Sequence, residues 1–119
     1  MDIRRLSQRQ EILAGDHTHL RELLHGPNEG MPLRYSLAWA SLPVGARSLP
    51  HRLKESSEVY YFLHGQGRMH VGSEEASVTA GDTVLVPPGA TQWLVNEGGC
   101  PLEFLCIVDP GWRADDEEV

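Results

Sequence analysis

The side chains best suited to chemistry in this chain are the imidazole of His51 and the carboxylate of Glu58, seven residues further on. Both lie in a stretch of regularly spaced glycines. A second such stretch contains the turn at 87–89 and then the amide of Gln92. Imidazole, carboxylate and amide groups can hold a metal ion or form hydrogen bonds with a small ligand. We therefore expect a polar site where the two stretches meet.

Short strands separated by turns must position these groups. Residues 33–42 alternate with a period of two, and later runs are rich in branched and aromatic residues between Gly and Pro turns. The strands expected after the first are 58–63, 68–71, 76–79, 83–86, 92–95 and 102–108. No helical period is sustained past residue 26. Many short strands at regular spacing are typical of an all-β sandwich or barrel.

Strand geometry then predicts how the polar groups converge. Residues two apart on a strand share a face, so His51 and Leu53 should both point into the barrel. A turn after Leu53 should bring Glu58 in from the neighbouring strand, and the turn at 87–89 should bring Gln92 in from a third. Donors that converge from separate strands form a rigid cup, which is what a metal site requires.

The spacing within the two stretches matches a known family. The first stretch runs Gly45, five residues, His51, one, Leu53, four, Glu58, six, Gly65; the second runs Gly81, five residues, Pro87, one, Gly89, two, Gln92, three, Asn96. From about residue 31 to 108 the chain thus resembles the cupin family, whose motifs have histidine at the positions of Leu53 and Gln92. The resemblance implies an all-β, single-domain cupin jelly-roll β-barrel with a short N-terminal arm.

The resemblance also implies a divalent metal ion, often iron, manganese, nickel or zinc, held by three histidines and one glutamate. His51 and Glu58 match that pattern, Gln92 offers an amide oxygen, and Leu53 offers no donor. The implied metal ligands are therefore His51, Glu58 and Gln92, a set that shifts the preference toward harder ions. The alternative left open is that no metal is held tightly and the three side chains bond one another or a ligand.

Four residues are predicted to line the pocket. Tyr60 shares the face of Glu58 and could reach a ligand through its hydroxyl, and Met69 is expected inward on its own strand. Leu53 would supply an apolar wall. Arg47, just before His51, could bind a carboxylate or phosphate at the rim through its two-pronged guanidinium.

Length and composition predict one domain in three parts: an N-terminal arm and edge segment at 1–30, the barrel at 31–110 and an acidic, disordered tail at 111–119. The net charge of −7 argues against a nucleic-acid partner. No apolar run could span a bilayer, and the N-terminus lacks a secretory signal, so we expect a cytoplasmic protein. Covering the sheet edges favours a homodimer.

Two functions follow from these expectations. The first is a metal-dependent enzyme acting on a small molecule in the barrel mouth, and the family resemblance suggests an oxygenase, isomerase or decarboxylase. The second is a non-catalytic cupin that binds or senses a small ligand and has lost tight metal binding; Leu53 and Gln92 favour it because they make the site less charged. A purely structural domain is a third and weaker reading, since His51 and Glu58 are retained.

Overall fold

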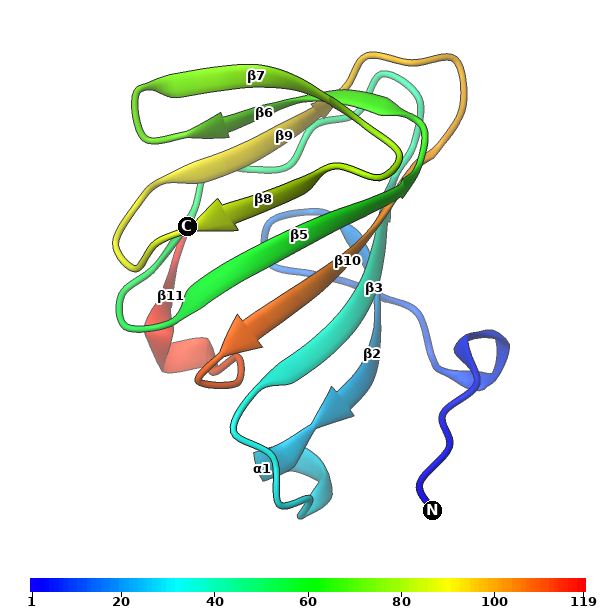
Figure 1. The fold of residues 1–119 in the computed structure, drawn as a ribbon, viewed down its shortest axis with the longest axis vertical. Helices are drawn as coiled ribbons and strands as arrows, with labels where there is room; N and C mark the ends of the chain where they lie inside the picture. The colour runs from blue at the N-terminus through cyan, green and yellow to red at the C-terminus, as the bar shows by residue number, and fades with distance from the viewer.

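Strand β5 (Ser57–His64) shows how the sequence pattern becomes structure in the computed structural model, which describes residues 1–119 (Figure 1). Glu58, Tyr60 and Phe62 are buried on its inner face, whereas Tyr61 is exposed on the other. The inward face predicted from the alternation is therefore confirmed, and it brings a carboxylate and a phenol into the interior.

The other elements are short. The strands are β1 (Ile12–Leu13), β2 (His19–His25), β3 (Ser36–Leu42), β4 (Arg52–Leu53), β6 (Gln66–Val71), β7 (Glu74–Thr79), β8 (Thr83–Val86), β9 (Gln92–Asn96), β10 (Leu102–Asp109) and β11 (Glu117–Glu118). One helical turn, α1 (Gly26–Glu29), and two 3-10 turns, η1 (Leu6–Gln8) and η2 (Ala114–Asp116), complete the chain. None of these helices has the length and apolar character needed to cross a membrane.

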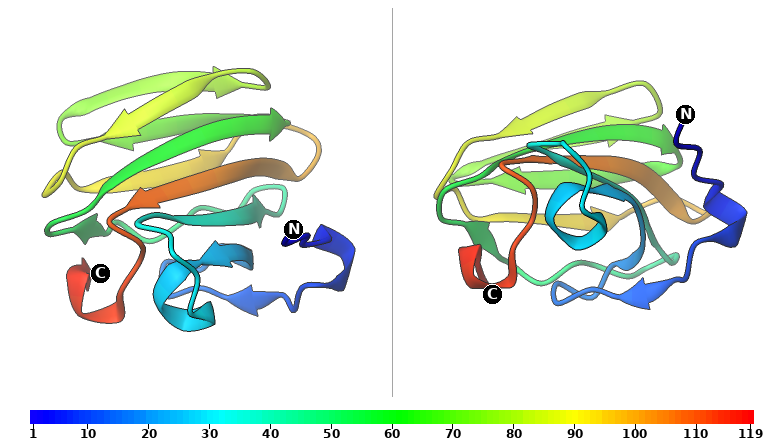
Figure 2. Two further views of the ribbon diagram at one scale, coloured as in Figure 1. Left: turned by 60° about the horizontal axis from the view of Figure 1, so that its bottom comes forward. Right: turned by 90° about the horizontal axis from the view of Figure 1, so that it is seen from below.

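The strands form an antiparallel β-barrel from facing sheets (Figure 2). The larger sheet has the order β1-β2-β3-β10-β5-β8, and the smaller one has the order β7-β6-β9. A two-stranded sheet, β11-β4, lies at one end. The all-β fold predicted from the sequence is thus confirmed, and the N-terminal residues 12–25 extend the larger sheet through β1 and β2.

The core lies between the sheets. Its buried residues are Ala40, Leu42, Tyr60, Phe62, Met69, Val78, Val86, Leu94, Leu102, Phe104 and Cys106. Gly65 makes the turn from β5 to β6 with φ of 93°, and a Cβ there would lie 2.9 Å from the Pro101 carbonyl oxygen. Only glycine adopts this backbone without strain.

The outer face of the larger sheet is also apolar. On β3 the buried residues are Ser36, Ala40 and Leu42, so the larger side chains of Leu37 and Trp39 point the other way. They continue across β10, where Leu105 lies opposite Trp39 and Ile107 opposite Leu37. The sheet is therefore hydrophobic on both faces; the inner one is covered within the chain, whereas Tyr61, Leu85 and Ile107 of the outer one are exposed.

The acidic C-terminal residues differ from the expected disordered tail. Glu117 and Glu118 of β11 pair with Leu53 and Arg52 of β4. Asp116 is 1% exposed, and its carboxylate accepts hydrogen bonds from the backbone amides of Glu55 at 2.8 Å and Ser56 at 3.2 Å. The prediction of a disordered tail is wrong for Asp116. Its charge suggests a solvated residue, but it caps the turn at Glu55 and Ser56.

The structure predicts that this cap stabilises the fold. Burial alone would raise the pKa of Asp116, but the hydrogen bonds from Glu55 and Ser56 lower it overall. Asp116→Ala should reduce the free energy of unfolding by about 1–3 kcal/mol near neutral pH, because two buried amides lose their acceptor. Since the native pKa is depressed, this contribution is present above the ordinary Asp pKa and is lost as the pH falls through the native value.

Urea denaturation at several pH values measures the effect. The matched control is Asp115→Ala, because the Asp115 side chain is 82% exposed and makes no such cap. An equal loss of stability in the two variants would contradict the role assigned to Asp116.

Candidate functional site

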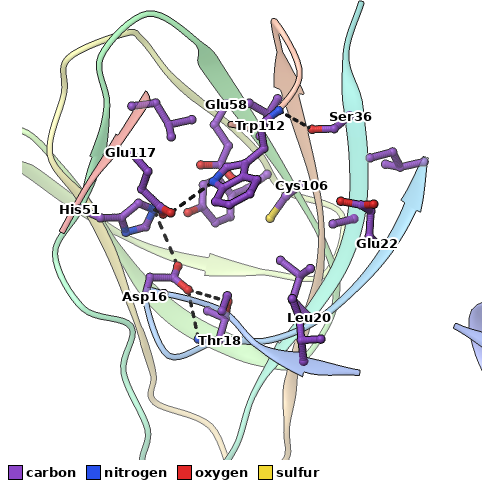
Figure 3. Close-up of a pocket in the computed structure, with 18 of the residues that line it drawn as sticks. Asp16, Thr18, Leu20, Glu22, Ser36, His51, Glu58, Cys106, Trp112 and Glu117 are labelled. Carbon is purple, nitrogen blue, oxygen red and sulfur yellow. Dashed lines mark hydrogen bonds and ion pairs between the residues drawn. The ribbon is translucent and has the colours of Figure 1, made fainter. Parts of the chain in front are cut away.

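A cavity of about 210 Å³ lies beside the inner face of the larger sheet (Figure 3). Residues of β3, β5 and β10 line one part of it, and His51, Leu53 and residues of the N- and C-terminal segments line the rest. Most of the lining is apolar, including Leu20, Leu53, Phe104 and Val108. The polar groups that reach it are few, and several of them are ionisable.

His51 enters this cavity from the segment just before β4, which pairs with β9 of the smaller sheet. Its backbone pairs with that of Gln92, with N–H to carbonyl distances of 3.1 and 2.8 Å in the two directions. Its Nδ1 lies 3.0 Å from the Leu49 carbonyl oxygen. Because a carbonyl can only accept, Nδ1 carries the proton and donates it. The other ring nitrogen, Nε2, therefore faces the cavity.

Asp16 approaches Nε2 from the N-terminal segment. One carboxylate oxygen accepts from the backbone amide and hydroxyl of Thr18, at 3.1 and 2.8 Å. The Leu49 amide donates to the Asp16 carbonyl at 2.7 Å, which ties this loop to the segment before His51. The second carboxylate oxygen lies 3.7 Å from His51 Nε2. The loop is thus fixed with a carboxylate aimed at the imidazole.

Glu117 approaches the same nitrogen from the C-terminal segment. Its Oε1 lies 4.0 Å from His51 Nε2, while its Oε2 accepts from the Trp112 indole N–H at 3.2 Å. The pairing of β11 with β4 places Glu117 opposite Leu53. Each terminus therefore contributes one carboxylate to the site.

Glu58 is buried nearby on β5. Burial is the largest influence on its carboxyl and raises its pKa to about 7; Asp16 raises it further, while His51, Cys106 and Gln92 lower it. Burial also raises the pKa of Glu117, an effect that His51 partly offsets. The Cys106 thiol has its pKa raised by burial and by Glu58, so it is not poised as a nucleophile.

Gln92 lies behind these groups and is fully buried. Its Oε1 accepts a hydrogen bond from the Tyr60 hydroxyl, whose pKa is raised chiefly by burial. Its Nε2 has no hydrogen-bond partner. Gln92 does not line the cavity itself. Its amide lies behind the lining residues, where it holds the Tyr60 hydroxyl and interacts with Glu58.

A resident metal ion fits these residues poorly. No three or more His, Cys, Asp and Glu side chains are grouped to hold one. In the implied set of His51, Glu58 and Gln92, the amide oxygen is already engaged by Tyr60. Leu53 is buried and supplies no donor. That ligand set remains a prediction.

The four predicted pocket residues separate in space. Leu53 and Tyr60 line the cavity. Met69 is packed in the core and borders a different hollow, because β6 belongs to the opposite sheet. Arg47 is exposed, with its guanidinium 5.9 Å from the centroid of the Trp93 ring. It is drawn outward to that aromatic face and not toward the cavity.

Asp16 and Glu117 were not anticipated from the sequence. Neither belongs to the spaced motifs, and each reaches His51 only through tertiary pairing of a terminal segment. Trp112 was the one available signal for the C-terminus, since a large aromatic residue is unusual beside a solvated acidic run. Nothing comparable singles out Asp16.

Comparisons with known proteins agree with this architecture. A family model described as "Cupin domain" matches residues 38–108. An uncharacterized protein, MJ1618, from Methanocaldococcus jannaschii is 39% identical over 104 residues, which cover 87% of this chain and 82% of that protein. The oxalate-binding protein of Thermotoga maritima is 31% identical over 67 residues, covering 56% of this chain and 55% of that protein.

Among solved structures, a predicted oxalate decarboxylase from Thermotoga maritima superimposes with a TM-score of 0.82. It is 24% identical, and the alignment covers 92% of this chain and 99% of that one. At this identity the likeness concerns the fold alone.

The raised pKa of Glu58 predicts a pH-dependent cost to stability. In the unfolded chain the carboxyl should titrate near its ordinary value of 4.5, so folding favours the protonated form. Stability associated with Glu58 is therefore greatest below that value and falls as the pH rises toward 7. Glu58→Gln should remove the cost and stabilise the protein by up to about 3 kcal/mol near pH 8, with a smaller gain near pH 5.

Urea denaturation of both proteins at the two pH values tests this expectation, and carbon NMR of the Glu58 carboxyl gives its pKa directly. Asp16→Asn should lower that pKa by removing a neighbouring negative charge. A Glu58 carboxyl that titrates near 4.5 would show the prediction to be wrong.

Proposed function

Because this chain belongs to the cupin family, we propose that it binds a small molecule in the cavity beside its larger sheet. The observation that carries the proposal is an apolar cavity of about 210 Å³ into which buried His51 and Glu58 project. Pockets that bind small molecules are typically concave and mostly apolar, with a few polar groups that fix orientation. The perturbed pKa of Glu58 in the same cavity supports this assignment.

Binding without a tightly held metal is the version best supported. Two of the four family ligand positions hold Leu53 and Gln92, and the Gln92 oxygen is occupied by the Tyr60 hydroxyl. In this version His51 and Glu58 act as hydrogen-bonding groups for the ligand. Tyr60 would complete the polar end of the pocket, and Leu53 would pack against the apolar part of the ligand.

A metal-dependent enzyme is the second candidate. The observation in its favour is His51 Nε2, which faces the cavity with no partner at hydrogen-bonding distance while Nδ1 is held by Leu49. With an ion bound by His51, Glu58 and Gln92, the metal would supply Lewis-acid polarisation of a substrate. Tyr60 would first have to release the Gln92 oxygen.

Metal content and bound ligand together separate the two candidates. Protein purified without chelators should carry well under one metal ion per chain by plasma mass spectrometry, and native mass spectrometry should detect a small organic ligand. One ion per chain that His51→Ala removes would contradict the metal-free version. As a converse test, Leu53→His combined with Gln92→His should raise zinc or manganese affinity by about tenfold or more, because two imidazole donors are restored.

Absence of any small molecule from the cavity in native mass spectra, together with no response to a ligand library in thermal-shift assays, would contradict the binding function itself. Leu20→Trp provides an internal control, since it should fill the apolar cavity and abolish ligand retention. The metal-site residues are untouched by that substitution.

We further propose that the chain forms a homodimer through the outer face of the larger sheet. Val59 lies opposite both Ile107 and Leu85, and Tyr61 lies opposite Leu105. Leu85 is 63% exposed and Ile107 38%. A continuous exposed apolar face of this kind supports self-association.

Ile107→Glu should convert the dimer into monomers, because a charge would be buried in the interface. Light scattering coupled to size-exclusion chromatography measures the mass. The matched control is Val44→Glu, since Val44 is exposed in a turn outside the sheet. A wild-type protein that is monomeric at all accessible concentrations would contradict the proposal.

A further inference from the structure

The cavity has a pronounced imbalance of charge. Its lining includes four carboxylates, from Asp16, Glu22, Glu58 and Glu117, and a single imidazole, from His51. No lysine or arginine lines it. An anionic ligand would therefore meet like charges on several sides, among them buried Asp16 and Glu58, where repulsion is poorly screened.

His51 adds an observation independent of the acidic residues. Its side chain is 4% exposed, yet Nε2 makes no hydrogen bond, since the nearest carboxylate oxygens are 3.7 Å away on Asp16 and 4.0 Å away on Glu117. These separations exceed those of a hydrogen bond. His51 Nε2 and the nearest oxygens of Asp16 and Glu117 thus face one another without forming a hydrogen bond (Figure 3).

The protonation state of His51 does not remove the imbalance. With the imidazole neutral, its Nε2 lone pair, the second Asp16 oxygen and Glu117 Oε1 are all acceptors, and none of the three can donate to the others. With the imidazole protonated, one positive charge faces the carboxylates of Asp16, Glu117 and Glu58.

We infer that the cavity selects a small organic cation, with an ammonium head at His51, Asp16 and Glu117 and an apolar body against the sheet. This inference rests on the proposed small-molecule function and names the ligand class. A primary ammonium has three N–H donors and no acceptor, which matches three converging acceptors. The apolar body would contact Leu20, Phe104 and Val108, which line the same cavity.

The volume sets the size of that body. A cavity of about 150 Å³ lined by apolar side chains can hold benzene. The present cavity of about 210 Å³ therefore has room for one six-membered ring with a short aminomethyl arm. Longer polyamines would not fit within it.

Three ring compounds of equal size and different charge test the inference: benzylamine, benzyl alcohol and benzoate. Their affinities are measured by isothermal titration calorimetry near pH 8 with EDTA present, so that divalent metals do not contribute. Protonated benzylamine should bind at least about tenfold more tightly than benzyl alcohol, and benzoate should not bind.

Two variants locate the binding site. Asp16→Asn and Glu117→Gln should each weaken benzylamine binding by about tenfold and leave benzyl alcohol unchanged, because only the charge is removed. Asp16→Asn retains an oxygen that can accept from Thr18. Glu118→Gln is the matched control: it removes one charge from the adjacent residue, whose side chain pairs with Arg52 and does not line the cavity. Circular dichroism verifies that all three variants are folded.

Each outcome is decisive. Equal or tighter binding of benzyl alcohol or benzoate would overturn the cation inference and leave small-molecule binding intact. The same is true if Glu118→Gln weakens benzylamine binding as much as Glu117→Gln does. If none of the three compounds binds, the cation inference is wrong, while the proposed function is tested separately by ligand retention in native mass spectra.

Discussion

The site depends on one backbone pairing, the two hydrogen bonds that join His51 to Gln92 of β9. This bridge fixes the direction of both side chains at once. The His51 imidazole points into the cavity, and the Gln92 amide points into the core toward Tyr60. The segment that follows His51 continues as β4, whose free edge is then available to β11. The position of Glu117 in the site follows from that edge.

A second consequence is electrostatic. The terminal segments bring Asp16 and Glu117 to a region where β5 has already buried Glu58, and no basic side chain other than His51 accompanies them. Buried carboxylates without cationic partners resist ionisation, which is why the pKa of Glu58 rises to about 7. The arrangement is costly for folding, and proteins commonly retain such costs at sites that bind ligands. The burial of these groups is therefore more informative about function than their mere presence.

Local patterns in the sequence were sufficient for the barrel and for part of the site. Alternation predicted the inner face of β5, including Glu58 and Tyr60, and the glycine turns predicted where strands end. What failed depended on long-range partners. Arg47 is close enough to His51 in sequence to reach the mouth of the barrel, yet its guanidinium lies over Trp93. Trp93 is distant in sequence, so local patterns do not predict this contact. Met69 points inward as its strand requires, but from the sheet that does not border the cavity.

The terminal acids show the same limit more sharply. A run of four acidic residues at 115–118 has the composition of a solvated end, and composition does not distinguish a capping carboxylate from an exposed one. The difference arises because the turn after β4 leaves the amides of Glu55 and Ser56 without backbone partners, and Asp116 satisfies both. Once Asp116 is fixed there, Glu117 has to lie opposite Leu53. Glu117, from outside the family motif, thus approaches Leu53, the position at which the motif would place a second histidine. A set of imidazoles suited to a metal ion is replaced by a set of hydrogen-bond acceptors suited to a donor.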